Sequence, residues 1–167
     1  MNSKPNTVTN IVFAGLGGQG VIKASEIAAG AAFLAGRDVK KSELHGMSQR
    51  GGSVSSDVRF GESVLSPMVP PREADYLVVF AQDQVEVNRW QLRDGGILIA
   101  QEMIDPKGLP NKKALNVALL GMLSAHLDIP EERWREAIMA NLPEKLHEAN
   151  FEAFELGRRT ARGEFAL

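Results

Sequence analysis

The sequence predicts an α/β protein, a three-layer α/β/α sandwich around a mostly parallel, mixed sheet. Short apolar runs typical of buried strands alternate with stretches whose apolar residues recur at helical spacing. Hydrophobic residues make up 44% of the 167 residues and charged residues 24%, a balance that can bury a real core. No linker composition divides the chain, so we expect residues 1–167 to form a single domain.

The first strand–turn–helix unit is the clearest in the sequence. Residues 11–14 (IVFA) form an apolar run suited to a buried strand, and the glycine-rich stretch GLGGQG follows at 15–20. Val, Ile and Ala then recur at helical spacing over residues 21–35. Gly36 is a natural stop for that helix. We expect its alanines to pack closely on the sheet.

The next stretch is more polar. Residues 38–44 form a second, polar candidate strand. Residues 52–60 alternate between apolar and polar, which predicts a half-exposed strand that is antiparallel to a neighbour or near an edge. Three prolines between residues 67 and 71 exclude regular structure there.

The middle of the chain predicts two further strands separated by a helix. Residues 74–81 (ADYLVVFA) are strongly apolar and predict a second buried strand. Residues 83–94 have the pattern of an amphipathic helix closed by Gly95. Residues 95–102 predict another buried strand.

The last third is predicted to be helical. Residues 113–129 are apolar nearly all round, which indicates a covered helix. Pro130, followed by two glutamates, suits the first turn of the next helix. Asn141 is a candidate N-cap for a last helix beginning near Pro143.

Composition excludes several classes of function. The chain has no cysteine, so it cannot supply disulfides, zinc thiolates or iron–sulfur ligands. A net charge of −2 and a pI of about 5.9 argue against general binding to nucleic acid or anionic membranes. The polar N-terminus is not a signal peptide, and the longest apolar run, near 114–127, is too short to span a membrane. We therefore expect a cytoplasmic protein that contacts neither nucleic acid nor membrane.

The glycine turn supports two interpretations. Gly15, Gly17 and Gly20 satisfy G-x-G-x-x-G, which in dinucleotide-binding folds brings a pyrophosphate to a helix N-terminus. The acidic ribose partner expected after the next strand is replaced by lysines, which disfavours NAD. The interpretation we favour is a turn that needs positive φ or close packing. The candidate cofactor-binding residues are Gly15, Gly17, Gly18, Gln19 and Gly20, and the Gln19 amide can face a ligand or bond a neighbouring loop.

A second unusual stretch is KSELHGMSQRGG at 41–52. His45 has no sequence neighbour that would complete a metal site, so we expect no metal. A catalytic triad whose members meet only in space stays open as an alternative, but we favour the interpretation with no catalytic residue in this chain. Arg50 between a polar run and two glycines suits a carboxylate, a phosphate or an ion pair between subunits, or else a solvated loop. We interpret the stretch as a contact surface. The candidate residues for an interface or an active-site-facing loop are His45, Gly46, Gln49, Arg50, Gly51 and Gly52.

The ordered segments GLGGQGVIKASEIAAGAAFLAG, SELHGMSQRGGSVSSDVRFG and SPMVPPREADYLVVF resemble the gamma subunit, or gamma domain, of 2-oxoacid:ferredoxin oxidoreductases. HGMSQRGG is most similar to the smaller subunit of the indolepyruvate branch. The resemblance covers nearly the whole chain. Residues 105–116 are shorter than the matching connection in many members, so the branch and its 2-oxoacid stay open.

The resemblance implies a subunit of a hetero-oligomeric oxidoreductase. Such a complex decarboxylates a 2-oxoacid on thiamine diphosphate and passes electrons through iron–sulfur clusters to ferredoxin. It usually forms an acyl-CoA, so coenzyme A is a candidate ligand of the complex. Thiamine diphosphate, magnesium and the clusters belong to partner alpha and beta subunits, which leaves this chain an accessory gamma subunit, inactive alone and binding no cofactor by itself. The alternative is an independent Rossmann-like nucleotide-binding or regulatory domain.

Overall fold

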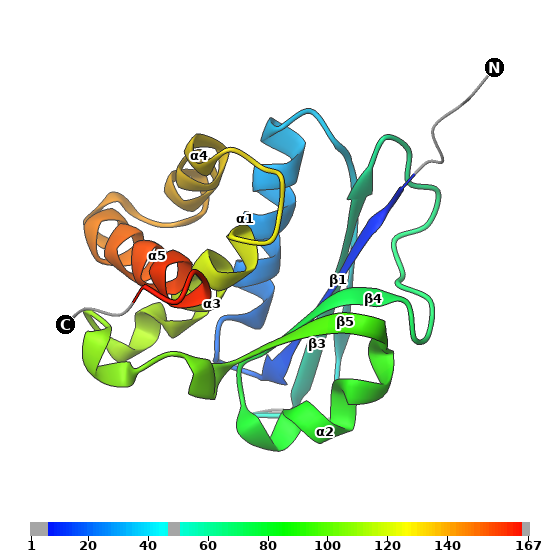
Figure 1. The fold of residues 1–167 in the computed structure, drawn as a ribbon, viewed down its shortest axis with the longest axis horizontal. Helices are drawn as coiled ribbons and strands as arrows, with labels where there is room; N and C mark the ends of the chain where they lie inside the picture. The colour runs from blue at the N-terminus through cyan, green and yellow to red at the C-terminus, as the bar shows by residue number, and fades with distance from the viewer. Residues whose placement is uncertain (1–6, 47–50, 165–167) are drawn as a thin grey trace.

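A computed structural model describes residues 7–46 and 51–164. A five-stranded sheet with the order β2-β3-β1-β4-β5 carries helices on its faces (Figure 1). The strands are β1 (Thr9–Leu16), β2 (Asp38–His45), β3 (Ser53–Gly61), β4 (Ala74–Val79) and β5 (Leu92–Ala100). The helices are α1 (Val21–Leu34), α2 (Val85–Asn88), α3 (Leu115–Ser124), α4 (Glu131–Asn141) and α5 (His147–Ala161). Three short 3₁₀ turns lie between residues 101 and 114.

The predicted mixed sheet is confirmed. β4 pairs in parallel with both β1 and β5, whereas β3 is antiparallel to both β1 and β2. β3 is therefore the one strand of this sheet that runs against the others. The alternating pattern of residues 52–60 correctly predicted an antiparallel strand, and the polar strand β2 lies at the edge.

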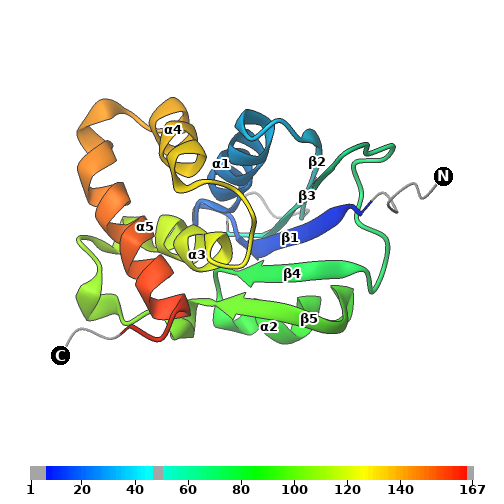
Figure 2. The ribbon, with the colours of Figure 1, turned by 45° about the horizontal axis from the view of Figure 1, so that its top comes forward.

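The main core lies between the sheet and helices α1, α3, α4 and α5, which all cover one face (Figures 1 and 2). Ile11 and Phe13 of β1 are fully buried there, as are the alanines that α1 turns toward the sheet. Small side chains on α1 let the helix approach β3 closely, as the Ala-rich pattern predicted. α3 is buried along almost its whole length, which confirms the expected covered helix.

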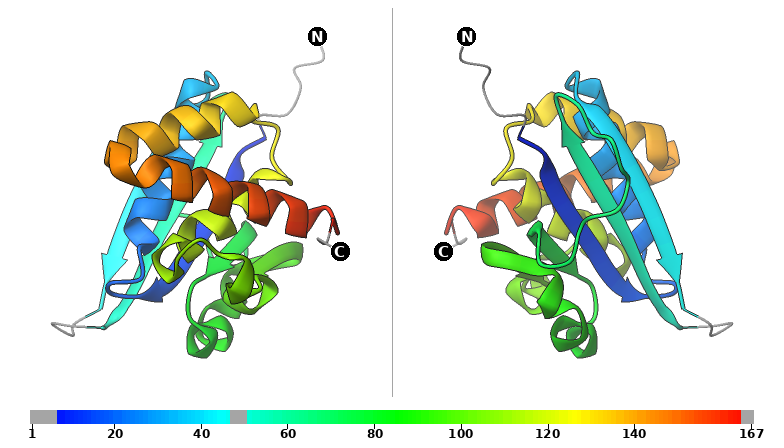
Figure 3. Two further views of the ribbon diagram at one scale, coloured as in Figure 1. Left: turned by 90° about the vertical axis from the view of Figure 1, so that its left-hand side faces the viewer. Right: turned by 90° about the vertical axis from the view of Figure 1, so that its right-hand side faces the viewer.

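The opposite face of the sheet, which we call the second face, has a thin cover. Figure 3 shows the β3–β4 loop, residues 62–73, crossing it. A smaller core forms there between Val12, Leu77 and Val79 of the sheet, Val85 of α2 and Val69 of the loop. The predicted third layer is thus present, but it consists of one short helix and a loop.

The C-terminal helices are joined by close contact of their backbones. A Cβ atom on Gly121 of α3 would lie 2.0 Å from the carbonyl oxygen of Phe154, and one on Gly157 of α5 would lie 1.8 Å from that of Ala118. Only glycine at both positions lets α3 and α5 cross at this distance. This crossing fixes α3, whose first residues reach the glycine turn.

Two predictions about local structure are wrong. The helix predicted over residues 83–94 ends after four α-helical residues, and β5 already begins at Leu92. The ion pair between Arg93 and Asp75, at 2.7 Å, anchors this extended start beside β4. Gly95, with φ at 74°, lies within the strand and does not close a helix. Asn141 is also not an N-cap, because its side chain donates back to Ala137 O within α4.

The boundaries of α1 and α4 follow the sequence signals, whereas α3 ends at Ser124, before the predicted end at residue 129. α1 ends just before Gly36, which has φ at 83°. α4 begins directly after Pro130 with two glutamates in its first turn. Within the described ranges, no helix combines the length and apolarity that crossing a membrane requires.

Candidate functional site

The glycine turn lies at the carboxyl end of β1 and leads into α1. Gly18 and Gly20 have φ of 87° and 79°, a backbone conformation that residues with a Cβ rarely adopt. Gly20 is the N-cap of α1, and its carbonyl accepts the Ala24 N–H at 2.9 Å. The conformational role that we favoured for the turn therefore holds at these two glycines.

Gly15 and Gln19 support the turn from inside. Gly15 is buried within β1, and a Cβ there would lie 2.8 Å from Gln19 Oε1 and 3.0 Å from Phe80 Cβ. Gln19 Oε1 accepts the backbone N–H of Leu16 at 2.7 Å. The carbonyl end of the Gln19 side chain is thus committed to holding the turn.

Asn116, at the start of α3, touches the turn from the opposite side. Its Nδ2 donates to Gly20 O at 3.3 Å, and a Cβ on Gly20 would lie only 2.5 Å from that nitrogen. Asn116 was not among the candidate residues predicted from the sequence. A lone amide at the start of an otherwise apolar helix was the available signal, because a buried polar side chain needs a partner.

A cavity of about 540 Å³ opens beside the turn, where β1 and β4 end. The connection from β1 runs through α1 toward one edge of the sheet, and that from β4 runs through α2 toward the other. Open α/β sheets bind ligands at such a switch point. The cavity is lined by Gly18, Gln19, Gly20, Phe80, Gln101, Lys112, Lys113, Leu115 and Asn116. Its two lysines favour an anionic ligand.

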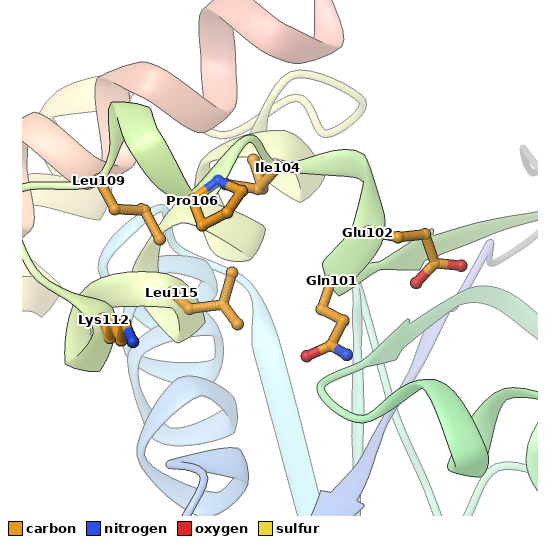
Figure 4. Close-up of a pocket in the computed structure, with 7 residues that line it drawn as sticks. All are labelled: Gln101, Glu102, Ile104, Pro106, Leu109, Lys112 and Leu115. Atoms are coloured by element: carbon orange, nitrogen blue, oxygen red, sulfur yellow. The ribbon is translucent and has the colours of Figure 1, made fainter.

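An apolar pocket of about 410 Å³ adjoins this cavity and shares Gln101, Lys112 and Leu115 with it. Figure 4 shows Pro106, Leu109 and Leu115 gathered on one side of the pocket, with Gln101 on the other. Together the two hollows form a groove that is cationic near the glycine turn and apolar at Ile104, Pro106 and Leu109, with the Glu102 side chain beside Gln101. We call it the carboxyl-edge groove.

The second motif meets the first at this end of the molecule. The backbone N–H of Gly17 donates to Gly52 O at 2.9 Å, and a Cβ on Gly17 would lie 3.5 Å from Gly51 N. Gly46 N donates to Ser53 O, which pairs the ends of β2 and β3. The structure thus brings the glycine turn together with Gly46, Gly51 and Gly52. Gln49 and Arg50 lie outside the described residues.

His45 ends β2 and lines a small pocket of about 260 Å³ with Gly17 and Gly18. Its Nε2 lies 3.5 Å from Glu43 Oε2, and Lys41 Nζ bonds the other oxygen of that carboxylate. The Lys41 ammonium is the main cause that lowers the pKa of the Glu43 carboxyl, and His45 adds to it. Alternate residues of a strand share a face, so this partner of His45 could have been found from the sequence.

The described residues contain no group of three His, Asp or Glu side chains arranged to hold a metal ion. What they form is a surface of glycine backbone and His45 beside a groove with two lysines. Such a surface can bind an anion or a partner chain.

Comparison with known proteins identifies the family to which the chain belongs. The model of the pyruvate ferredoxin/flavodoxin oxidoreductase family matches residues 10–111 and 99–160. The chain belongs to that family. It is a small, gamma-type member, as the motifs indicated.

Individual relatives agree with this placement. The chain is 34% identical to indolepyruvate oxidoreductase subunit IorB of Thermococcus kodakarensis, over 92% of this chain and 96% of that protein. The gamma subunit of a keto/oxoacid ferredoxin oxidoreductase from Geobacter sulfurreducens has the same fold, with a TM-score of 0.79, 24% identity and coverage of 93% and 99% of the two chains.

A third similar structure places the fold within a longer chain. It is a 2-oxoglutarate:ferredoxin oxidoreductase from Magnetococcus marinus, solved with 2-oxoglutarate, coenzyme A and succinyl-CoA. The TM-score is 0.78 at 21% identity, and the match covers 93% of this chain but 31% of the Magnetococcus chain. The gamma-type fold therefore occurs both as a separate chain and as part of a larger one.

Proposed function

We propose that this chain is the accessory, non-catalytic gamma subunit of a thiamine-diphosphate-dependent 2-oxoacid:ferredoxin oxidoreductase complex. The observation that carries the proposal is the hydrogen bond from Gly17 N to Gly52 O, which joins both family motifs into one surface. Separate loops that converge on one end of a sheet are typical of a binding surface. This surface faces the thiamine-bearing partner.

The residues of the chain indicate that the cofactors of the complex are bound by its other subunits. Without cysteine it can ligate no iron–sulfur cluster, so the clusters lie in partner subunits. The thiamine diphosphate and its magnesium also lie there, because the chain lacks the motif that binds them. We expect the isolated chain to be inactive, and the cytoplasmic complex to pass its electrons to ferredoxin.

The carboxyl-edge groove gives the subunit a second role, as part of the coenzyme A site. Lys112 and Lys113 supply positive charge for phosphate groups, and Ile104, Pro106 and Leu109 supply an apolar surface. The related Magnetococcus structure contains coenzyme A. The residues of the groove therefore fit an anionic ligand with an apolar part.

The substrate that we favour is indolepyruvate. Two relatives with 34% and 32% identity, from Thermococcus kodakarensis and Pyrococcus horikoshii, are named as indolepyruvate oxidoreductase subunits. A pyruvate/ketoisovalerate gamma subunit and a 2-oxoglutarate synthase subunit also match along nearly their whole length, at the lower identities of 30% and 28%. The 2-oxoacid itself reacts on the partner subunit, so the choice between substrates depends on residues outside this chain.

Co-expression tests the proposal. The chain is produced with candidate thiamine-binding and cluster-binding subunits from the same organism, under anaerobic conditions. We expect a complex that reduces ferredoxin or a viologen dye with indolepyruvate, and no activity from this chain alone. Failure of the chain to co-purify with any thiamine-binding subunit would contradict the proposal.

An independent nucleotide-binding domain is the competing function, and the cationic groove is the observation in its favour. Calorimetry on the isolated chain with NAD, FAD and ATP distinguishes the two. Micromolar binding of one of these nucleotides, together with no complex formation, would favour the independent domain.

A further inference from the structure

The β3–β4 loop, residues 62–73, holds exposed apolar side chains on a fixed backbone. Val64 is buried, and Val69 packs into the small core of the second face. Between these anchors, Leu65 and Met68 are 92% and 65% exposed. Figure 3 shows the loop lying across the strands in its right-hand view.

The conformation of this loop is set by the sheet beneath it. Three polar side chains bond its backbone: Asp38 accepts from Val64 N at 2.7 Å, Asp57 accepts from Val69 N at 2.9 Å, and Arg59 donates to Ser66 O at 2.8 Å. Both anchors and the segment between them are therefore held. Leu65 and Met68 form a preorganised ridge, which loses little backbone freedom when a partner binds.

The chemistry of the ridge differs from that of the rest of the chain. Charged residues make up 24% of the protein, yet residues 63–71 (SVLSPMVPP) contain none. Depletion of charge and an exposed Met are features of the core of a protein interface.

The ridge continues toward the end of the molecule that carries the family motifs. Ser42 Oγ donates to Pro67 O at 3.4 Å, which places β2 beside the loop. Two residues further along β2, Leu44 is 72% exposed and lines a pocket with His45 and Gly46. Ser42 and Leu44 are alternate residues of β2 and share one face, so the loop lies on the same face as Leu44. That face leads to the motif surface, which is the surface formed by Gly17, Gly52 and His45.

From this arrangement we infer that Leu65 and Met68 anchor the chain, through their apolar side chains, to the same thiamine-bearing subunit that the motif surface faces. The inference rests on the proposed function. An apolar, preorganised ridge suits a stable subunit contact, because obligate interfaces are more hydrophobic than transient ones.

A second copy of this chain is a less suitable partner for the ridge than a different subunit. A two-fold symmetric interface places the same patch against itself. Two protruding ridges meet over little area, whereas a ridge buries its side chains best in a groove of a different surface.

The test uses the full chain with its partner subunits. The double variant Leu65→Ser/Met68→Ser removes the apolar side chains at exposed positions. Phe33→Ser, at a 70% exposed position on α1, is the matched control. Affinity for the partner is measured by biolayer interferometry, melting temperature checks the fold of each variant, and sedimentation reports self-association.

We expect the double variant to bind the partner at least about tenfold more weakly, with the control unchanged and all three melting temperatures alike. If wild type and double variant bind equally well, the ridge inference is overturned while the proposed function stands. If the wild type self-associates, and the double variant loses self-association but keeps its affinity for the partner, then the ridge contacts a second copy of this chain. That result also overturns the inference. If the wild type binds no partner subunit, the proposed function fails, and the inference that rests on it fails too.

Discussion

Gly17 and Gly52 are joined by a 2.9 Å backbone hydrogen bond, although they belong to two motifs separated by a helix and a strand. The bond requires an N–H at Gly17, and a Cβ there would have ordinary contacts of 3.5 Å or more with the other motif. The pairing of the two motifs therefore depends on the donor and not on the missing side chain.

Gly17→Pro and Gly17→Ala separate these two properties. Proline removes the N–H and restricts φ, whereas alanine keeps the donor. We expect the alanine variant to retain nearly wild-type activity of the assembled complex, and the proline variant to lose most of it while the chain stays folded. Circular dichroism checks the fold and dye reduction the activity. Equal activity of the two variants would contradict a role for this bond.

Loss of the lysines in the carboxyl-edge groove should affect coenzyme A before it affects the 2-oxoacid. In Lys112→Ala/Lys113→Ala we expect the KM for coenzyme A to rise roughly tenfold, because hydrogen bonds to charged groups contribute about 1.5–3 kcal/mol. The KM for the 2-oxoacid should stay unchanged. Lys145→Ala, an exposed lysine after α4, is the control. A rise in both KM values would point to a general defect of the complex.

The stability of the second face should depend on pH through Asp57. Burial raises the pKa of this carboxyl above its usual value of 3.8, outweighing the opposing effects of the Val69 N–H and Arg59. A raised folded-state pKa stabilises the fold fully below about 3.8, and that contribution is lost as the pH rises through the folded pKa. We expect wild type to gain stability relative to Asp57→Asn as the pH falls from 7 to below 4.

Urea unfolding at several pH values measures this difference. Asparagine keeps an acceptor for the Val69 N–H, so the comparison isolates the charge. Glu152→Gln, on the exposed side of α5, is the matched carboxylate control. If the stability difference between wild type and Asp57→Asn did not change with pH, the pKa of Asp57 would not be raised in the folded protein.

Two glycine-to-alanine changes within helices should have opposite signs. In Gly157→Ala the new Cβ would overlap the carbonyl of Ala118, so α3 and α5 must separate, at a cost of about 3 kcal/mol or more. In Gly30→Ala the new Cβ meets Ala137 Cβ at an ordinary 3.5 Å, and helix propensity should stabilise α1 by roughly 0.5–1 kcal/mol. Chemical denaturation checks both. Equal effects would mean that the α3–α5 crossing can relax.

Local sequence patterns predicted an element correctly where its apolar residues follow one clear pattern along the chain. The apolar run of β1, the alternation of β3 and the covered helix α3 were all correct, because burial decides each of them. The start of β5 was missed because its anchor, Asp75, lies on another strand, and no local pattern shows an ion pair between strands. Asn141 was misassigned because an amide that caps a helix and one that bonds back within it look alike in sequence.

The candidate site was predicted in part. The glycines of the turn and His45 were identified, but the role of Asn116 was not, since its partner is 96 residues away. The groove lysines were also missed, because the 3₁₀ turns that bring them beside Gly20 have no recognisable sequence signature. The site residues that local sequence patterns could not predict were thus those positioned by contacts between distant segments.

The Asn116–Gly20 hydrogen bond also bears on the order of folding. Contacts between residues far apart in the chain form late, because the entropy of closing a long loop must first be overcome. The glycine turn is made early during synthesis, but it acquires its last partner only after α3 has left the ribosome and docked. In a nascent chain, or in one truncated before α3, the glycine turn would lack the hydrogen bond from Asn116. Only the complete subunit would therefore present the fully formed turn to its partner.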